Sequence, residues 1–180
     1  MFPAEMLKGC PAEQFPQGHF EAVTAHGRGV FKGMKLFLDC ELTQLSARAK
    51  LISLALVAED GQEFYVELLD VWRLEECSQF VVDIVLPQLW KGEYAMPAMD
   101  AHTALLNFLA SFDELLEIVT DAPEYDWELF CELAYDQGHW PKNVRNYPTN
   151  AMDLIATNGG EALPHHALLD ARIIAGMFQA

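Results

Sequence analysis

Three closely spaced apolar segments near the start of the chain constrain its fold more than any other feature of the sequence. Residues 35–39 form a short apolar run, and residues 51–58 form a longer run that is typical of a strand buried on both faces. The pair Asp60-Gly61 favours a hairpin turn, and residues 63–68 after it nearly alternate between apolar and polar side chains. The three segments therefore predict an antiparallel meander.

The rest of the chain alternates between helical and strand-like patterns. Apolar spacing predicts helices at residues 77–89, with Pro87 near the end, and at 99–112, followed by a strand at 115–120 and a helix at 125–135. A loop rich in Asn and Pro at 141–150 precedes a short helix at 151–156, and a helix at 164–179 with Pro164 in its first turn closes the chain. Strands first and alternation afterwards predict an α/β fold, a mixed sheet flanked by helices.

The first 33 residues differ from the remainder. They contain Pro3, Pro11 and Pro16 and show no sustained period of 2 or 3.6 residues. We expect residues 1–33 to form a flexible or loosely packed arm, or an extension ahead of a true translation start at Met34. Residues 34–180 are then the single domain, and a chain of 180 residues that is 52% apolar can bury one core.

The charge of the chain limits the substrates that it can hold. Its 27 acidic residues outnumber the 11 basic residues and give a formal charge of −16. Proteins that hold long nucleic acids need clustered Lys and Arg to neutralise phosphates, and this chain lacks them. An acidic protein can still act on nucleic acid if bound cations lie between its carboxylates and the phosphates. The charge therefore favours a small or single-stranded substrate held at its end.

Targeting features point to the cytoplasm. The four cysteines are far apart and form no C-x-x-C pair, so reduced thiols are expected rather than a zinc site or a disulfide framework. No segment approaches the roughly 20 apolar residues of a membrane span, and the N-terminus lacks a basic start followed by an apolar run. The sequence predicts a cytoplasmic protein without a membrane partner.

Two acidic elements could bind cations. Asp39 and Glu41 end the first predicted strand, and residues i and i+2 of a strand point to the same face. Two carboxylates so close to each other require a counter-ion. D-x-E triplets are frequent, however, and a solvated strand end is the more common explanation for one such triplet alone. Asp126 follows the strand at 115–120, where ordinary helix N-terminal chemistry also favours acids. Asp121 lies nearby as a cap or as a competing metal-site residue.

A third element lies near the C-terminus. His166 and Asp170, four residues apart, share a helix face, whereas His165 and Asp170 are about 140° apart around a helix. His165 and Asp170 border one cavity only if His165 lies in the first turn or in the loop before it. Taken alone, the pair is better explained by a surface histidine near a helix start.

In this order and spacing, the three elements resemble the DEDDh family of 3′→5′ exonucleases, over roughly residues 34–178. The resemblance is closest to small bacterial or phage exoribonuclease-type proteins. The matching positions are Asp39-Cys-Glu41-Leu-Thr43-Gln-Leu45 for D-x-E-x-T-x-L, Tyr125-Asp126 for the aromatic-Asp motif, and His165-His-Ala167-Leu168-Leu-Asp170-Ala171 for the last motif. Two departures stand out, since Gln44 replaces a frequent Gly and Asp121 lies where the family often has Asn.

The resemblance implies a ribonuclease H-like fold and a two-cation site. Asp39 would bridge two divalent cations, with Glu41 and Asp170 on the first and Asp126 on the second. Hard carboxylate ligands favour Mg²⁺ or Mn²⁺ over zinc. His165 would be the catalytic general base, because histidine titrates in the required range.

The resemblance also implies where the substrate lies. Leu42, Thr43 and Leu45 would border the terminal nucleotide, with Leu45 wedged between the last two bases, although plain core packing is the alternative for Leu45. The expected activity is a metal-dependent 3′→5′ exoribonuclease that releases 5′-mononucleotides from single-stranded or overhanging RNA 3′ ends. The alternatives are a DNA exonuclease of the same chemistry and a catalytically silent binding module of the same fold. Relatives are often homodimers, so the resemblance also favours a homodimer.

Overall fold

The computed structural model of the protein describes residues 33–136, 138–152 and 164–179. Nearly all of the arm predicted at residues 1–33, and most of the helix predicted at 151–156, lie outside these described residues. The division at residue 33 therefore stays a prediction. None of the helices in the described part of the chain combines the length and the hydropathy needed to span a bilayer.

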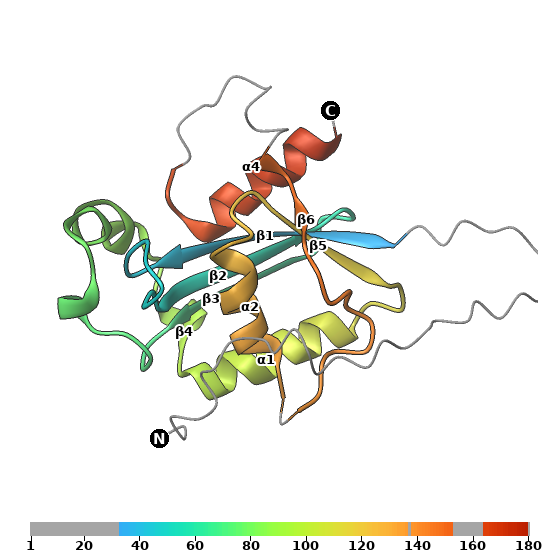
Figure 1. The fold of residues 1–180 in the computed structure, drawn as a ribbon, viewed down its shortest axis with the longest axis horizontal. Coiled ribbons are helices and arrows are strands. Elements are labelled where there is room, and N and C mark those ends of the chain that lie inside the picture. The colour runs from blue at the N-terminus through green and yellow to red at the C-terminus, as the bar shows by residue number, and fades with distance from the viewer. Residues whose placement is uncertain (1–32, 137, 153–163, 180) are drawn as a thin grey trace, which may run out of the picture.

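The centre of the molecule is a six-stranded sheet in the order β4-β3-β2-β1-β5-β6 (Figure 1). β1, β2 and β3 form the predicted antiparallel meander, whereas β5 pairs parallel to β1, β6 pairs parallel to β5, and β4 pairs parallel to β3. The mixed sheet confirms the predicted fold class. The strands are β1 Met34–Leu42, β2 Leu51–Ala58, β3 Glu63–Leu68, β4 Ala95–Met96, β5 Leu116–Thr120 and β6 Thr149–Asn150.

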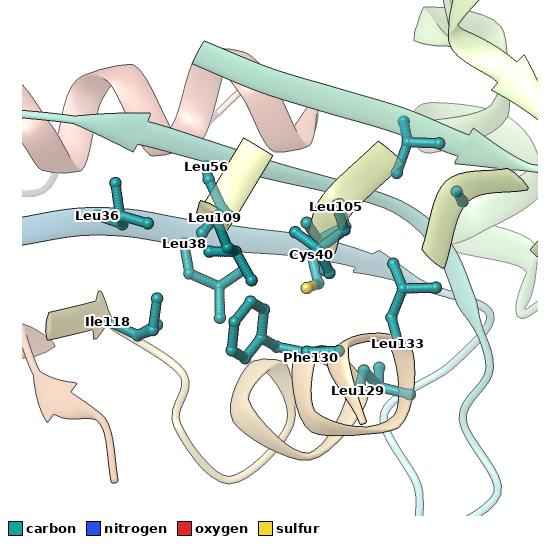
Figure 2. Packing of buried hydrophobic residues seen from close by; sticks show 14 of the residues in the cluster. Leu36, Leu38, Cys40, Leu56, Leu105, Leu109, Ile118, Leu129, Phe130 and Leu133 are labelled. Carbon is teal, nitrogen blue, oxygen red and sulfur yellow. The ribbon is translucent and has the colours of Figure 1, made fainter. Parts of the chain in front are cut away.

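In the described part of the chain, three α-helices cover the two faces of this sheet (Figure 1). α1 (Ala98–Ala110) and α2 (Asp126–Ala134) lie on one face, and α4 (Ala167–Gln179) lies on the other. Leu36, Leu38 and Cys40 of β1 pack with α1 and α2 around the fully buried Phe130, as Figure 2 shows. Because side chains alternate along a strand, residues 37, 39 and 41 of β1 point to the face covered by α4.

The segment between β3 and β4 differs from the α-helix predicted at residues 77–89. It forms a π-helical turn at Val81–Val85 and a 3₁₀ turn at Leu86–Gln88, with Leu86 N–H donating to the carbonyl of Val81. Pro87 explains the difference, because its ring would clash with the carbonyl four residues earlier in an α-helix. Further 3₁₀ turns lie at Leu74–Glu76 and Gly92–Tyr94.

The C-terminal helix begins three residues later than predicted. α4 starts at Ala167, so Pro164 is outside its first turn and His165 lies in the preceding turn with φ of 63°. A positive φ is uncommon for a residue with a side chain and interrupts a helix. The late start satisfies the condition under which His165 and Asp170 can border the same cavity.

Candidate metal centre

The end of β1 presents two carboxylates beneath α4. The side chains of Asp39 and Glu41 lie on the same face of the strand, and each residue is only 8% exposed. A β-bulge between β1 and β2 lies directly after Glu41, since Glu41 pairs with Ser53 but Leu42 pairs with Leu51. Bulges of this kind end regular pairing and redirect side chains next to active sites. The sheet therefore fixes the predicted pair at the point where its regular ladder ends.

Two helix starts bring further carboxylates to this pair. Asp126 begins α2, and its Oδ2 accepts a 2.6 Å hydrogen bond from the Thr120 hydroxyl at the end of β5. Asp170 lies in the first turn of α4, and its Oδ2 accepts the N–H groups of His165 (3.0 Å) and His166 (3.2 Å). The other carboxylate oxygen of Asp170, Oδ1, is buried without a hydrogen-bond partner. That oxygen can accept a cation without losing an existing bond.

The five acidic side chains form two groups that share one member. Asp39, Glu41 and Asp170 form the first group, and Asp39, Asp121 and Asp126 form the second. Within each group, one possible ligand atom per residue lies within 4.8 Å of the others. The structure thus brings together the four predicted metal ligands, with Asp39 in the position common to both groups. It adds Asp121, for which the sequence suggested two roles without choosing between them.

Burial and mutual repulsion raise the pKa values of these carboxyl groups. The pKa of Asp39 is raised well above its ordinary value, chiefly by burial and then by the charges of Asp126, Glu41, Asp170 and Asp121. Burial, followed by the charges of Asp170 and Asp126, raises the pKa of Glu41 to about 8. In the described residues, none of the ion pairs joins a Lys or Arg to these five carboxylates.

Burial is also the main cause of the raised pKa values of Asp126 and Asp170. Burial raises the pKa of Asp126 to about 8, although the hydrogen bond from Thr120 opposes the shift. Burial also raises the pKa of Asp170 to about 6, against the two backbone hydrogen bonds that it accepts. Buried carboxylates without basic partners are costly unless they are protonated or coordinate cations. The donor set, oxygen only and acidic, fits hard divalent ions such as Mg²⁺ or Mn²⁺.

The two adjacent histidines lie in different surroundings. His165 is half-buried, and its ring meets the Phe80 ring edge-on at 4.9 Å between centroids. His166 is 2% exposed, and its ring packs against the rings of Tyr65 (4.9 Å between centroids) and Trp90 (4.6 Å). Burial lowers the pKa of His166. His166 is therefore part of the packing around α4, and His165 is the histidine with access to solvent.

The residues predicted to contact substrate surround the end of β1. Leu42 and Thr43 are buried, and the Thr43 hydroxyl accepts the N–H of Lys50 at 3.1 Å. Leu45, in the loop after β1, is 77% exposed. Core packing therefore does not explain Leu45 in this structure, and the side chain is available to a ligand.

Comparisons with known proteins point to the same class of enzyme. No protein-family model matches the chain. The chain is 28% identical over 153 residues to a 3′-5′ exoribonuclease of Mycobacterium tuberculosis, from strains CDC 1551 and H37Rv. The aligned region covers 77% of this chain and 88% of the relative. These relatives support assignment to 3′→5′ exonucleases.

Among solved structures, the crystal structure of cell-death related nuclease 4 resembles this protein with a TM-score of 0.54 and 16% sequence identity. The match covers 82% of this chain and 62% of that nuclease, so the chain spans less than two thirds of its length. At this identity the likeness shows the fold, a mixed sheet flanked by helices of the ribonuclease H-like type.

The raised pKa values predict how stability depends on pH without metal. Glu41 and Asp126, at about 8 in the fold, have ordinary values of 4.5 and 3.8. In the unfolded chain they are already ionised at pH 6.5, so the folded state must lose their protons as the pH rises. The free energy of unfolding in EDTA should therefore fall between about pH 6.5 and 9.

Thermal unfolding in EDTA and in Mg²⁺ measures this effect. Mg²⁺ should raise the melting temperature most at the upper end of the range, where the carboxylates are ionised in both states. The window begins at pH 6.5 because the lowered pKa of His166, ordinarily 6.5, acts in the opposite direction and mostly below that value. Above pH 6.5 the two carboxyl groups outweigh this one imidazole. A melting temperature in EDTA that is constant or rises over this range would contradict the electrostatic description of the site.

Proposed function

We propose that the protein is a metal-dependent 3′→5′ exonuclease that releases 5′-mononucleotides from single-stranded or overhanging RNA. The observation that carries this proposal is the presence of two clusters of three acidic side chains each, which have Asp39 in common. The unpartnered Oδ1 of Asp170 supports it, because a buried carboxylate oxygen needs a positive partner. Asp39, Glu41 and Asp170 would hold one divalent ion, and Asp39, Asp126 and Asp121 a second.

The protein side chains and the ions divide the chemistry between them. Two bound divalent ions would supply the positive charge that stabilises the charge developing on the phosphate. His165, at the open edge of the site, takes the proton of the attacking water as the water oxygen bonds to phosphorus. The bond from phosphorus to the 3′-oxygen of the preceding nucleotide breaks, and this oxygen takes up a proton from solvent to become the new 3′-hydroxyl. The terminal nucleotide leaves as a 5′-monophosphate.

The preference for a short or single-stranded end follows from charge and from Leu45. With a net charge of −16, the protein cannot attract an extended polyanion over long range. Recognition then depends on the ions and on contacts to the last nucleotides, for which the exposed Leu45 and the neighbouring Leu42 and Thr43 are available. The choice of RNA rests on the name of the mycobacterial relatives. DNA is the alternative substrate for the same chemistry.

A catalytically silent module of the same fold is the alternative from a different class. The carboxylate set argues against it, because all four predicted ligands are present and grouped. Retaining five buried or half-buried acids costs stability, and a purely structural domain has no use for that cost.

Digestion of 5′-labelled oligomers tests the proposed activity. With Mn²⁺, single-stranded RNA and RNA with a 3′ overhang should give a ladder that shortens from the 3′ end, and blunt duplex should resist. Asp39→Asn should abolish the ladder in a folded protein, since it removes the charge common to both groups. Asp113→Asn, which changes an exposed acid to the same residue, is the matched control.

The outcomes separate the parts of the proposal. Activity above a few per cent in Asp39→Asn with normal metal binding would overturn the metal assignment. Faster digestion of blunt DNA than of single-stranded RNA would overturn the substrate assignment and leave the metal site intact.

The two histidines provide a second test. His165→Ala should lower the rate by about 10²–10⁴, the usual contribution of a general base, with little loss of metal affinity. His166→Ala should lower the melting temperature, because His166 packs against Tyr65 and Trp90, but it should lower the rate far less than His165→Ala does. If His166→Ala proves to be the catalytically inactive variant in folded protein, the last motif has been assigned one residue out of register.

Asp121 provides a third test, of the second ion specifically. Asp121→Asn removes one of three grouped carboxylates but leaves Asp39 and Asp126 in place. The concentration of Mn²⁺ needed for half-maximal rate should rise about tenfold or more, the usual scale for loss of a supporting group, while the rate at saturating Mn²⁺ recovers. An unchanged Mn²⁺ dependence would show that Asp121 is not a ligand.

A further inference from the structure

The segment that carries the irregular helix is attached at one end to the residues after β1 and at the other end to β3. We call residues 78–91 the arch; it lies beyond the tip of β1, drawn in green in Figure 1. At its start, the N–H of Ser78 donates to the carbonyl of Thr43 at 2.8 Å. At its end, the buried carboxylate of Glu67 accepts the N–H groups of Trp90 (2.7 Å) and Lys91 (3.0 Å). The arch is thus fixed both to the first motif and to β3.

Apolar contacts hold the middle of the arch against the sheet. Val81 and Val85 form a buried cluster with Ile52, the residue that the β-bulge leaves unpaired on β2. The bulge follows Glu41 directly, so the arch rests on the part of the sheet that positions the metal ligands. π-helical turns within helices are frequent at functional sites. The arch is therefore packed against the part of the sheet that carries the candidate metal ligands.

Gln88, near the end of the arch, contacts the turn that carries His165. Its Nε2 donates to the carbonyl of Pro164 at 2.6 Å and to that of Ile84 at 2.9 Å, and lies 3.3 Å from the carbonyl of His165. The two short bonds use both hydrogens of the amide, one within the arch and one to the turn. Phe80 of the same arch meets the His165 ring edge-on.

The turn requires such support because of its backbone conformation. His165 has a φ of 63°, which is strained for a residue with a β-carbon and persists only where the surroundings enforce it. Asp170 Oδ2 holds the N–H of His165 from the side of α4, and Gln88 holds the preceding carbonyl from the side of the arch. Loss of either contact would let the turn relax and rotate the imidazole away from its position.

We propose that Gln88 is a positioning residue that orients His165 for proton removal. This inference rests on the proposed function, in which His165 is the general base. Gln88 acts through the turn and does not contact the reacting atoms, so its effect should fall on the chemical step. A displacement of about 1 Å in a reacting group can lower a rate about 10²-fold.

Steady-state kinetics of Gln88→Met test the proposal, because Met has a similar shape and no donor. We expect kcat to fall about 10- to 100-fold, while KM for the oligomer and the Mn²⁺ dependence change by less than about twofold. Gln88→Glu, which also lacks a donor, should lose at least as much and provides a second variant if Gln88→Met fails to fold. Gln79→Met is the matched control, because Gln79 lies on the same arch and bonds only to Asp83 among the described residues. A kcat of Gln88→Met equal to that of the wild type would overturn the inference.

A double-mutant cycle with His165→Ala separates a positioning role from a general structural role. If Gln88 acts through His165, Gln88→Met should have no further effect on kcat in the His165→Ala background. An undiminished, additive loss in that background would overturn the positioning role. If His165→Ala itself retains full activity, the general base of the proposed function is wrong. A normal rate in Gln88→Met beside an impaired His165→Ala removes only the inference about Gln88.

Discussion

Repulsion among buried carboxylates is the constraint on which the rest of the structure depends. Asp39, Glu41, Asp126 and Asp170 are each 8% exposed or less, and Asp121 adds a fifth charge beside them. Ionised together in a medium of low polarity, they destabilise the fold. Divalent cations bound between these carboxylates would remove this cost and would give the arrangement a chemical use. The same repulsion that weakens the metal-free protein would then favour the cation binding on which the proposed activity depends.

The architecture concentrates these charges without weakening the hydrophobic core. β1 lies between β2 and β5, so strands support it on both sides. One face of β1 packs on α1 and α2 through Leu36 and Leu38 (Figure 2). The other face presents Asp39 and Glu41 towards α4, because side chains alternate along a strand. Because successive side chains of a strand point to opposite faces, the short strand β1 contributes to the hydrophobic core on one face and to the candidate site on the other. The starts of α2 and α4 then need to contribute only one carboxylate each.

Much of this arrangement could be predicted from the sequence, because it depends on local patterns. The meander was predicted closely, since β2 and β3 are long apolar or alternating runs with a hairpin turn between them. β4 and β6 have two residues each, too few to establish a period, and were not predicted. The four predicted ligands were identified through motif order and spacing, and the structure groups them. Their roles as ligands stay a prediction.

The remaining features depend on contacts that no local pattern encodes. Pro87 was visible in the sequence, but the π-helical turn before it depends on packing of Val81 and Val85 against a bulge in β2. The late start of α4 depends on Asp170 accepting two N–H groups ahead of the helix. Gln88 and Pro164 are 76 residues apart, so only the folded chain brings them together.

Direct observation of the ions tests the proposed two-ion site most simply, through calorimetric titration with Mn²⁺ combined with electron paramagnetic resonance. We expect two Mn²⁺ ions per chain, with the spectrum of a coupled pair about 4 Å apart. A single uncoupled ion, or no binding, would contradict it.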